Sequence, residues 1–409
     1  MNSKLQQSSR AVLNYLFQKQ AASRIQISHG LKMRPGTVGE ICDNLIKSKH
    51  ICPIDAGRQR NVMLKLNADK YMAIGVEHTA EGLIAVILSA DLSVKLQERI
   101  IIPETVDGQE RLLRIVAGID RLIQKSHCRS AVNGLGFCDI GMFDSHTGRS
   151  ICSELLPAWN DMPVKETLEK ALKTPVVLLG KMDETCVVEH KFGVAKEWKT
   201  FVCVMLDRVI GMSVMNGEQI VRGNDPVYGE LGHMVSNPAG EICKCGNRGC
   251  LETVASTDAV VKKVRSHMTP ADVQIFDASA DELTIENVIQ AAQKGHKLAE
   301  TALLEAAGAA GLALAQIVTV FGIKNIVLSG RLVKVGDLFL DPLKRTLRQY
   351  CVHPLNAQLE IVTSSLDEWS SARGAAYSVL ENYFSTRILH ENRAIFAFAQ
   401  AGIARRRKT

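Results

Sequence analysis

One imidazole and three thiols stand close together in the second half of the sequence. They are His233, Cys243, Cys245 and Cys250. One nitrogen and three sulfur donors supply the four ligands of a tetrahedral zinc ion, and Gly246 and Gly249 allow the tight turns that bring the sulfur atoms together. Because four protein ligands leave no open coordination position, we expect the zinc to be structural and not a water activator. The alternative is three reduced surface thiols beside an unrelated histidine, which the density of the ligands disfavours.

Composition limits the class of protein in which this cluster occurs. The chain has 409 residues, of which 46% are hydrophobic and 22% are charged, as expected for a globular protein of two or three domains. The other eight cysteines are scattered singly, which predicts reduced core residues. Met1–Arg10 has no apolar run behind a basic start, so we expect no secretory signal and a cytoplasmic location. Residues 306–323 are uncharged but rich in Ala and Gly, which favours a buried helix over a membrane span.

Positive charge is concentrated at the two ends of the chain. Residues 1–66 hold eleven Lys and Arg against three acids, a charge of +8, and the last 25 residues carry +5. Since the whole chain has a net charge of +6, the intervening body carries −7. This asymmetry indicates a polyanionic partner for the N-terminal part.

The N-terminal residues have the pattern of a small helical domain. Apolar side chains recur at helical spacing from Ser9 to Gln18, Ser23 is a candidate N-cap for a second helix, and a third helix follows the turn Arg34–Thr37. Two short helices joined by a tight turn are typical of a helix-turn-helix, in which the later helix lies in the DNA major groove. Two apolar segments, residues 51–54 and 62–66, then predict a β-hairpin wing.

Polar side chains that avoid the apolar stripe of the third helix are the candidates for groove contacts. These are Arg34, Thr37, Glu40 and Asn44. In the loop of the wing, Arg58 and Arg60 are expected to reach phosphates or a narrow minor groove. The alternative is a small domain whose charged faces are only solvated, but three helices, a basic wing and the +8 charge together favour DNA binding.

From Lys70 onward, apolar runs of strand length alternate with helical segments. Strands are predicted at residues 72–76, 83–88, 132–137, 201–206, 209–214, 325–329 and 359–362, with helices at 109–124 and 337–350 and a long helix that ends near Phe321. Two successive α/β lobes are implied.

A family resemblance emerges from the metal-ligand segment. Glu230-Leu-Gly-His233, followed by Cys-x-Cys-Gly-x-x-Gly-Cys-x-Glu from Cys243 to Glu252, resembles the signature of the ROK family of repressors, open reading frames and sugar kinases. The resemblance covers most of the chain and extends to residues 134–148, 156–159, 327–337 and 374–376. An N-terminal winged helix is typical of the repressor branch. The resemblance therefore implies an α/β fold, in which a winged helix-turn-helix precedes a two-lobed, actin-like ATPase body of the sugar-kinase type.

Four domains are expected on this basis. They are the winged helix-turn-helix at residues 1–67, the first α/β lobe at 68–190, the second lobe with the zinc site at 191–384 and a basic tail at 385–409. For the tail, a packed or partner-binding helix and a frayed terminus are both open.

The resemblance also implies a sugar site in the cleft between the lobes. The matching positions are Asp183, Glu230, His233 and Glu252. Carboxylates and imidazole suit vicinal hydroxyls, and His233 can give one ring nitrogen to zinc and the other to the ligand. Met182 replaces the family's Asn, and because a thioether lacks the amide's donor and acceptor, the expected affinity for an ordinary hexose is lower.

The segments that correspond to the kinase phosphate loops have lost their glycines. They read Glu77-His-Thr-Ala-Glu81 and Leu206-Asp-Arg-Val-Ile-Gly211. Side chains in place of glycine block close approach of a polyphosphate, and the carboxylates of both segments would repel it. Asp183 holds the general-base position of the kinases, but without a phosphate donor we interpret it as a vestigial base that accepts a sugar hydroxyl.

The sequence thus predicts a DNA-binding transcriptional regulator, with repression as the expected direction, whose kinase-derived body senses a sugar or sugar derivative. A homodimer or higher homo-oligomer would bind a pseudo-palindromic operator, and a phosphotransfer-system protein is a further candidate partner. Two alternatives stay open. One is a ROK-type ATP-dependent sugar kinase with an appended N-terminal module, and the other is a DNA-binding protein with a purely structural, ligand-free body.

Overall fold

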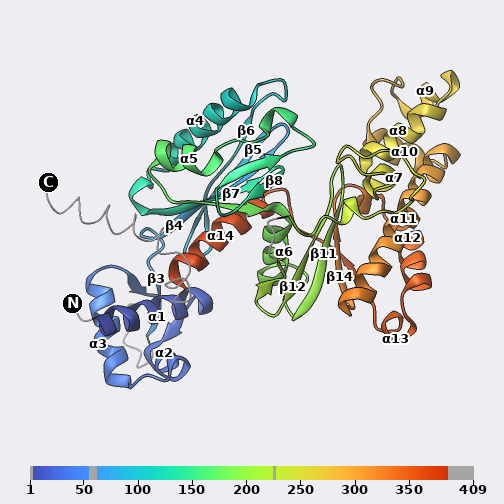
Figure 1. Cartoon of the computed structure of the whole chain (residues 1–409). Helices are drawn as coiled ribbons and strands as arrows, with labels where there is room; N and C mark the ends of the chain where they lie inside the picture. Colours follow the sequence, from blue (N-terminus) through green and yellow to red (C-terminus); the bar gives the residue numbers. More distant parts are fainter. Residues whose placement is uncertain (1–2, 55–61, 224–226, 386–409) are drawn as a thin grey trace. The chain divides into compact units, whose positions relative to one another are not determined.

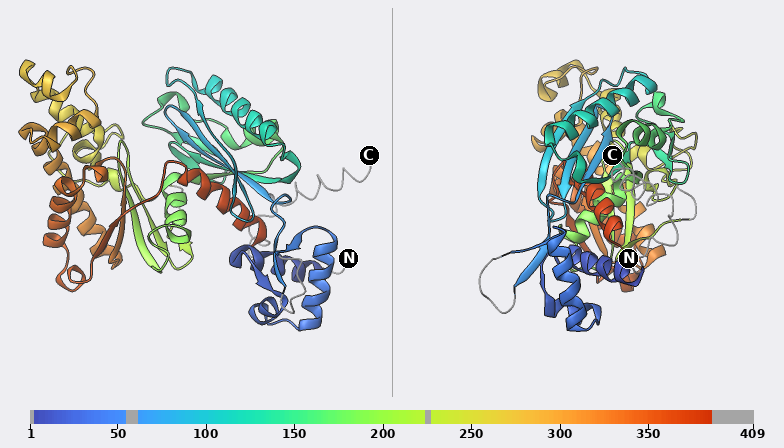
Figure 2. Two further views of the ribbon diagram at one scale, coloured as in Figure 1. Left: turned by 180° about the vertical axis from the view of Figure 1, so that it is seen from behind. Right: turned by 90° about the vertical axis from the view of Figure 1, so that its left-hand side faces the viewer.

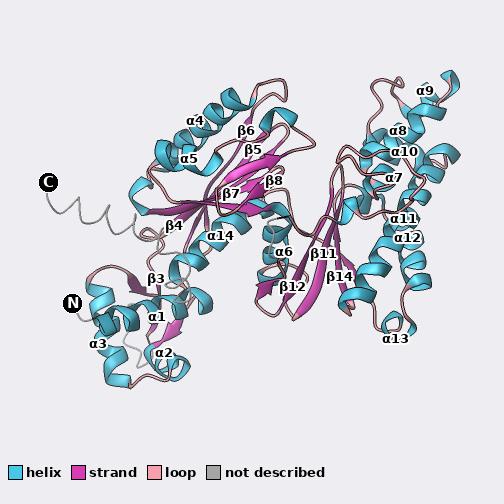
Figure 3. Cartoon of the chain, in the orientation of Figure 1, coloured by secondary structure: helices cyan, strands magenta, loops and turns pink. Residues whose placement is uncertain are grey.

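Two compact units make up the chain. The computed structural model describes residues 3–54, 62–223 and 227–385, and the first unit is formed from the described parts of Met1–Glu184 and Glu368–Thr409. The second unit is Thr185–Asp367, so the chain leaves the first unit and later returns to it (Figure 1). Both units contain a mixed β-sheet covered by helices, which confirms the predicted α/β class (Figure 3).

The N-terminal segment has three helices and a small sheet, as predicted. The helices are α1 (Ser3–Lys19), α2 (Arg24–Leu31) and α3 (Pro35–Lys47), and the strands β1 (Ala22–Ser23), β2 (Ile51–Pro53) and β3 (Met63–Leu66) pair in the order β1-β3-β2. Ser23 is the N-cap of α2, because its hydroxyl accepts the Gln26 N–H at 3.3 Å and its own N–H donates to the Gln26 side chain at 2.8 Å. The loop that carries Arg58 and Arg60 lies outside the described residues.

A five-stranded sheet forms the centre of the first unit, in the order β10-β7-β4-β5-β6. Its strands are β4 (Met72–Thr79), β5 (Gly82–Ser89), β6 (Val94–Ile101), β7 (Val132–Asp139) and β10 (Val176–Gly180). The first three form an antiparallel meander, and β7 and β10 extend it in parallel. A two-stranded hairpin, β8 (Met142–Asp144) and β9 (Arg149–Cys152), follows β7.

Helices cover both faces of this sheet because side chains alternate between its faces. One set of strand residues, which includes Ile74, Leu135 and Phe137, packs in a core with α4 (Gly108–Ser126) and α5 (Val164–Leu172). The alternate set, which includes Val86 and Cys138, meets α14 (Ser370–Phe384) on the other face (Figure 2).

Two strand glycines allow α14 to lie directly on the backbone of the sheet. A Cβ at Gly75 would overlap the carbonyl oxygen of Ala372, and one at Gly136 would lie 2.6 Å from that of Ala375. Any larger residue at these positions would have to push the helix away, since packed interiors have little free space. The sheet therefore fixes the position of α14.

Beyond the sheet, α14 ends in an aromatic cluster that holds the N-terminal segment. Phe17 of α1 lies 5.5 Å from the ring of Tyr377 and 5.1 Å from that of Phe384, and Tyr71 at the start of β4 lies 4.9 Å from Phe384. Gln18 donates a hydrogen bond to Glu381 at 3.2 Å. Phe17, Tyr71, Tyr377, Tyr383 and Phe384, here called the aromatic cluster, thus join the winged helix to the sheet of the first unit.

The second unit repeats the same strand arrangement. Its sheet has the order β13-β12-β11-β14-β15, made of β11 (Thr200–Leu206), β12 (Ile210–Asn216), β13 (Gln219–Ile220), β14 (Asn325–Ser329) and β15 (Glu360–Thr363). An antiparallel meander is again extended by two parallel strands. The core on one face is closed by α11 (Lys297–Phe321) and α12 (Asp337–Tyr350), with α7 (Glu252–Ala255), α8 (Thr257–His267) and α10 (Ile285–Gln293) packed around them. The remaining α-helices are α9 (Val273–Phe276), α13 (His353–Asn356) and α6 (Lys181–Lys191), whose first four residues belong to the first unit.

Among the described residues, α11 is the one helix that is long and apolar enough to cross a membrane. In its most apolar 18-residue window, 56% of the residues are buried inside the protein, where they pack on α12 and the sheet. It is thus the core helix that the sequence predicts for residues 306–323.

The predicted strands and helices are confirmed in type and position, but two strands of the first sheet were not predicted. These are β6, which is charged and half exposed at the sheet edge, and β10. The helix Ser370–Phe384 follows the second lobe in sequence, and the predicted boundaries place it there, yet it packs on β4, β5 and β7 of the first unit. Its position depends on contacts between residues almost three hundred positions apart, which local patterns do not encode.

The contact between α14 and the sheet can be tested with a pair of Gly→Ala variants. Gly75→Ala is expected to lower the free energy of unfolding by about 1–3 kcal/mol, because its methyl group has no space. Gly308→Ala in α11, where a Cβ would meet nothing within 4 Å, is expected to leave it unchanged or raise it by up to about 1 kcal/mol. Urea denaturation followed by circular dichroism measures both, and equal stabilities would disprove the close seating of the helix.

Candidate metal centre, ligand site and DNA-binding face

The four predicted metal ligands lie together in the second unit. The ligand atoms of His233, Cys243, Cys245 and Cys250 all lie within 4.8 Å of one another. The sulfur atoms of Cys245 and Cys250 are 3.7 Å apart, and Cys243 Sγ lies 3.8 Å from His233 Nδ1. With metal–sulfur bonds of about 2.3 Å, the edge of a tetrahedron is about 3.8 Å. The residues therefore fit a tetrahedral metal ion, held by three sulfur atoms and one nitrogen.

The loop around this cluster owes its shape to glycine and to short backbone hydrogen bonds. Gly246 and Gly249 have φ values of +93° and +73°, and a Cβ at Gly249 would overlap the carbonyl of Asn237. The Cys243 N–H donates to Asn247 O at 2.7 Å, which closes the turn between the first two thiols. The predicted role of both glycines is confirmed.

His233 connects the metal cluster to neighbouring carboxylates. Its Nδ1 faces Cys243, whereas its Nε2 lies 3.8 Å from Glu230 Oε2. Glu252 stands two residues after Cys250, is 8% exposed, and accepts the Ile210 N–H at 2.6 Å. A Cβ at Gly232 would lie 2.6 Å from Glu252 Cγ, so the glycine of the Glu-Leu-Gly-His segment makes room for that carboxylate. Glu230, His233 and Glu252 are thus grouped by one folded segment.

Asp183, the fourth residue predicted to contact a sugar, belongs to the first unit. It lies in the first turn of α6 and is 4% exposed. Two residues before it, Lys181 forms an ion pair with the buried Glu77 of β4 at 2.7 Å. Asp183 therefore follows β10 at the carboxyl end of the first sheet, where the parallel strands β4 and β7 also end.

The segment Glu77–Glu81, which was matched to the first phosphate loop, contains a tight hairpin turn between β4 and β5. Thr79 pairs with Gly82, so only two residues connect the strands. The buried guanidinium of Arg111 in α4 donates to Thr79 O at 2.8 Å and Ala80 O at 2.6 Å, and its Nε donates to His78 Nε2 at 2.9 Å. Since the carbonyls of the turn point at Arg111, they are fixed by a cation from inside the protein.

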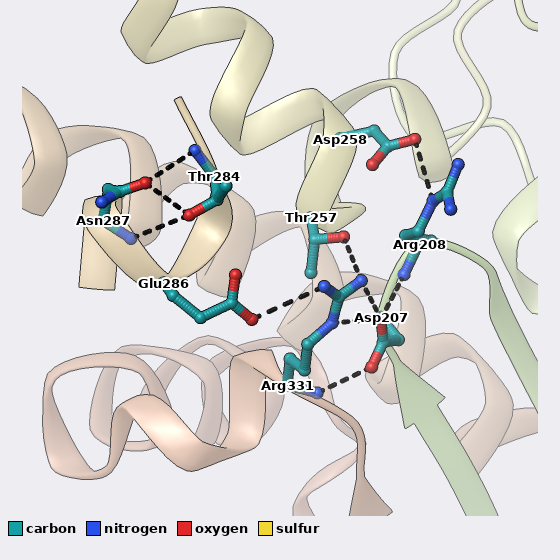
Figure 4. A network of polar contacts seen from close by, with 8 residues as sticks. All are labelled: Asp207, Arg208, Thr257, Asp258, Thr284, Glu286, Asn287 and Arg331. Carbon is teal, nitrogen blue, oxygen red and sulfur yellow. Dashed lines mark hydrogen bonds and ion pairs between the residues drawn. The ribbon is translucent and has the colours of Figure 1, made fainter. Parts of the chain in front are cut away.

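The second such segment, between β11 and β12, is closed by an ion pair. The Asp207 carboxylate accepts the Arg331 backbone N–H at 3.0 Å and its guanidinium Nε–H at 2.8 Å (Figure 4). The same guanidinium contacts Thr257 Oγ1 at 3.3 Å and Glu286 at 3.6 Å. Burial of Asp207 opposes its ionisation, but the hydrogen bonds and charge of Arg331 outweigh it and hold the pKa of this carboxyl below its usual value.

A cavity of 420 Å³ opens beside this ion pair. Its wall includes Arg208 of the β11–β12 turn, Arg331 after β14, and residues of α8 and α10. Four basic and two acidic side chains line it: Arg208, Lys262, Arg265, Arg331, Asp258 and Glu286. The cavity thus lies within the second unit, beside the turn that was matched to the second phosphate loop.

The third helix of the N-terminal segment separates its apolar and polar sides as predicted. Val38, Ile41, Cys42 and Leu45 of α3 are buried. The predicted groove-contact residues Arg34, Thr37, Glu40 and Asn44 are all exposed. Pro35 occupies the first helical position, which its fixed backbone angle favours. The exposed face of α3 is therefore available to a partner.

Two charged residues in these sites, the buried Arg111 and the partly exposed Arg331, were not predicted from the sequence. Arg111 interrupts the apolar stripe of α4, and an arginine in a buried stripe is a signal that it has a specific partner. Arg331 follows Gly330 in a segment that the resemblance had marked, but its partner Asp207 is 124 residues away. No local pattern could have paired them.

The ROK family model matches residues 73–382 of the chain. The chain belongs to the ROK family. Among its relatives is the xylose repressor of Caldicellulosiruptor bescii, which is 24% identical over 382 residues, or 91% of this chain and 95% of that protein. The family resemblance seen in the metal-ligand segment is therefore confirmed.

Two solved ROK structures share the fold. The structure of a ROK family transcriptional regulator, a homologue of the Escherichia coli MLC protein, has a TM-score of 0.79 at 20% identity and covers 94% of this chain and 98% of its own. A ROK glucokinase from Streptomyces griseus, solved with glucose and AMPPNP, has a TM-score of 0.64 at 23% identity and covers 75% of this chain and 98% of its own. The body thus has the actin-like fold of these sugar kinases, as predicted.

Removal of the metal ion is expected to destabilise the second unit, because binding of a structural ion and folding of its loop are coupled. A chelator or Cys245→Ser should lower the melting temperature and remove bound metal, as measured by calorimetry and elemental analysis. Cys128→Ser, a thiol of the first unit outside the cluster, is the control and should retain the metal. If the melting temperature is unchanged and no metal is detected, the prediction of a metal centre is wrong.

The ion pair between Asp207 and Arg331 should make stability depend on pH. Arg331→Gln is expected to lower the free energy of unfolding by about 1–3 kcal/mol at pH 7, because it leaves a largely buried carboxylate without its cation. The folded-state pKa of Asp207 is depressed, so the advantage of the native protein is present above the unfolded value of about 3.9 and is lost as the pH falls through the folded value. Urea denaturation from pH 8 to about pH 2 measures the difference in the free energy of unfolding, which should stay constant down to about pH 5 and narrow below it. If the native protein and Arg331→Gln have the same free energy of unfolding at pH 7, the ion pair does not stabilise the turn.

Proposed function

We propose that this protein is a DNA-binding transcriptional regulator of carbohydrate genes, with repression as the expected direction, and that its body binds a sugar or sugar derivative. The observation that carries this proposal is the exposed polar face of α3 in a strongly basic segment that is packed onto a ROK body. The repressor relative and the solved regulator extend over more than nine tenths of the chain, whereas the glucokinase structure covers 75% of it. This difference in coverage supports a regulator over a kinase.

In this proposal the N-terminal segment binds DNA as a winged helix. Arg34, Thr37, Glu40 and Asn44 of α3 contact base edges in the major groove, and Arg58 and Arg60 of the wing contact phosphates or the minor groove. A homodimer presents two such helices to the two halves of a pseudo-palindromic operator.

The proposed effector residues are Glu230, His233 and Glu252, and the family resemblance adds Asp183 to them. Carboxylates accept hydrogen bonds from sugar hydroxyls, and His233 adds Nε2, the ring nitrogen that faces Glu230. The metal ion is zinc in this proposal, since a set of three thiolates and one imidazole suits it. Held by four protein ligands, the ion keeps the His233 ring in place.

Helix α14 is the proposed route from the effector to the DNA. It begins three residues after the chain leaves the second unit, lies on the backbone of the first sheet and ends in the aromatic cluster that holds α1. A sugar that binds two arrangements of the units with different affinity shifts the equilibrium between them. The aromatic cluster would carry this shift to the winged helices, and release of DNA by the sugar is the expected direction.

The two altered turns argue against phosphoryl transfer. The Arg111 contacts and the Asp207–Arg331 ion pair occupy the turns that would have to bring backbone N–H groups to the phosphates of ATP. A sugar kinase with an appended module is the second candidate, and the 420 Å³ cavity beside Arg331 is the observation that favours it. The regulator proposal predicts no ATP-dependent phosphorylation of any sugar. A cytoplasmic location and a phosphotransfer-system protein as an additional partner are consistent with a regulator of sugar use.

The decisive experiment is capture of genomic DNA fragments on the purified, zinc-loaded full chain at fixed, near-physiological salt, with and without a panel of sugars. Salt is fixed because non-specific phosphate binding depends steeply on it. The expected result is enrichment of a few fragments that share an inverted repeat, with loss of binding in the presence of one sugar. Arg34→Ala should weaken this binding without a change in melting temperature.

Two further arms separate the parts of the proposal. Glu230→Gln should retain operator binding but lose the response to sugar, because an amide accepts fewer hydrogen bonds than a carboxylate. Sugar phosphorylation by the purified protein would favour the kinase candidate. If no sequence is enriched under any condition, the regulator proposal fails, and if no sugar raises the melting temperature, the body is ligand-free.

A further inference from the structure

One carboxylate lies on the face of α3 that is free to contact DNA. In α3 the exposed residues Thr37, Glu40, Asn44 and Lys47 recur at intervals of three and four, which places them on the face opposite the buried stripe. Glu40 lies in the middle of this series. A negative charge is therefore placed where the proposed function brings the phosphate backbone of DNA nearby.

The acidic residue is exceptional in its surroundings. The described part of the N-terminal segment, residues 3–54 and 62–66, contains nine Lys and Arg but only two acids, Glu40 and Asp43. Asp43 forms an ion pair with Arg24 of α2 at 2.6 Å and so helps to hold α2 against α3. The Glu40 side chain is exposed and has no hydrogen bond or ion pair with any described residue. Its carboxylate thus has no structural task in this segment.

The neighbour of Glu40 one turn earlier has no side chain. Gly36 precedes it by four residues, and a Cβ at Gly36 would meet nothing within 4 Å. Because no side chain projects from α3 at Gly36, its backbone can closely approach the bases at the floor of the DNA major groove. Glu40 is then within reach of base edges rather than of the phosphates at the groove rim.

Only hydrogen-bond donors can offset the cost of bringing a carboxylate into the major groove. Two base groups donate there, the N4 amino group of cytosine and the N6 amino group of adenine. Adenine places its N7 acceptor next to N6, and that lone pair repels a carboxylate. Cytosine has no acceptor next to N4 on the same base, and acceptance from its N4 is the favoured base contact of Glu.

We propose that Glu40 is a specificity-determining residue that accepts a hydrogen bond from the N4 amino group of one cytosine in each operator half-site. This inference rests on the proposed DNA-binding function and deepens it. The carboxylate weakens binding to DNA in general by repulsion and strengthens it at one base pair. Its contribution is therefore discrimination rather than affinity.

The test is selection of binding sites from randomised DNA with the full chain and with Glu40→Gln and Glu40→Ala, followed by affinity measurements at several salt concentrations. The native protein should select cytosine at one position of each half-site and bind it about 5–150-fold better than the other bases there. Glu40→Ala should lose this preference at that position alone and bind unrelated DNA more tightly. Glu40→Gln should change the preference toward adenine, because an amide pairs with both N6 and N7.

Asp43→Asn is the matched control. It removes a carboxylate from the same helix, but one that is already paired with Arg24 at the surface, so its effect on stability should be small. We expect it to leave the selected base at every position unchanged, and melting temperatures verify that all variants are folded.

The outcomes separate this inference from the function on which it rests. If the native chain selects no sequence at all, the DNA-binding function fails. If it selects a motif that both Glu40 variants keep at every position, the regulator stands and the cytosine contact is wrong. Tighter binding by the variants with an unchanged motif would show that Glu40 acts only through its charge, which also overturns the inference.

Discussion

The contact of α14 with the backbone of the first sheet is the constraint on which the arrangement of the first unit depends. Gly75 and Gly136 remove the side chains that would otherwise separate helix and strand. Backbone in contact with backbone leaves no soft layer, so the helix and the sheet must move as one body. Since the same helix ends in the aromatic cluster with Phe17 and Tyr71, the winged helix is fixed to that body rather than tethered by a loop.

In both units, charged side chains that are buried or partly buried hold a turn in place. Arg111 donates to the carbonyls of the β4–β5 turn, and Asp207 binds the backbone and side chain of Arg331 at the β11–β12 turn. A buried charge is costly without partners, so these groups determine the conformation of the turns that satisfy them. In both units the turn after the first strand of the sheet is thus held by charged side chains.

Unlike the two turns, the segment that holds His233 and the three thiols is shaped mainly by interactions between residues close in sequence. His233 and the three thiols lie within one stretch of chain, and glycines with positive φ close the loop around them. The same stretch carries Glu230 and Glu252, so the metal ligands and the carboxylates of the proposed effector site are positioned by one folded segment. A change in this segment would therefore disturb both.

The sequence alone determined the features that depend on neighbouring residues. The clustering of His233 with the three thiols, the buried and exposed faces of α3, the cap at Ser23 and most strands could be predicted because spacing and local hydrogen bonds specify them. Only the tertiary structure decided the features that join distant segments, such as the return of α14 to the first sheet and the pairing of Asp207 with Arg331. It also showed that Arg111 lies against a turn and that Glu40 has no partner in the described chain. The physical reason is that periodicity encodes which side of an element is buried but not which distant element covers it.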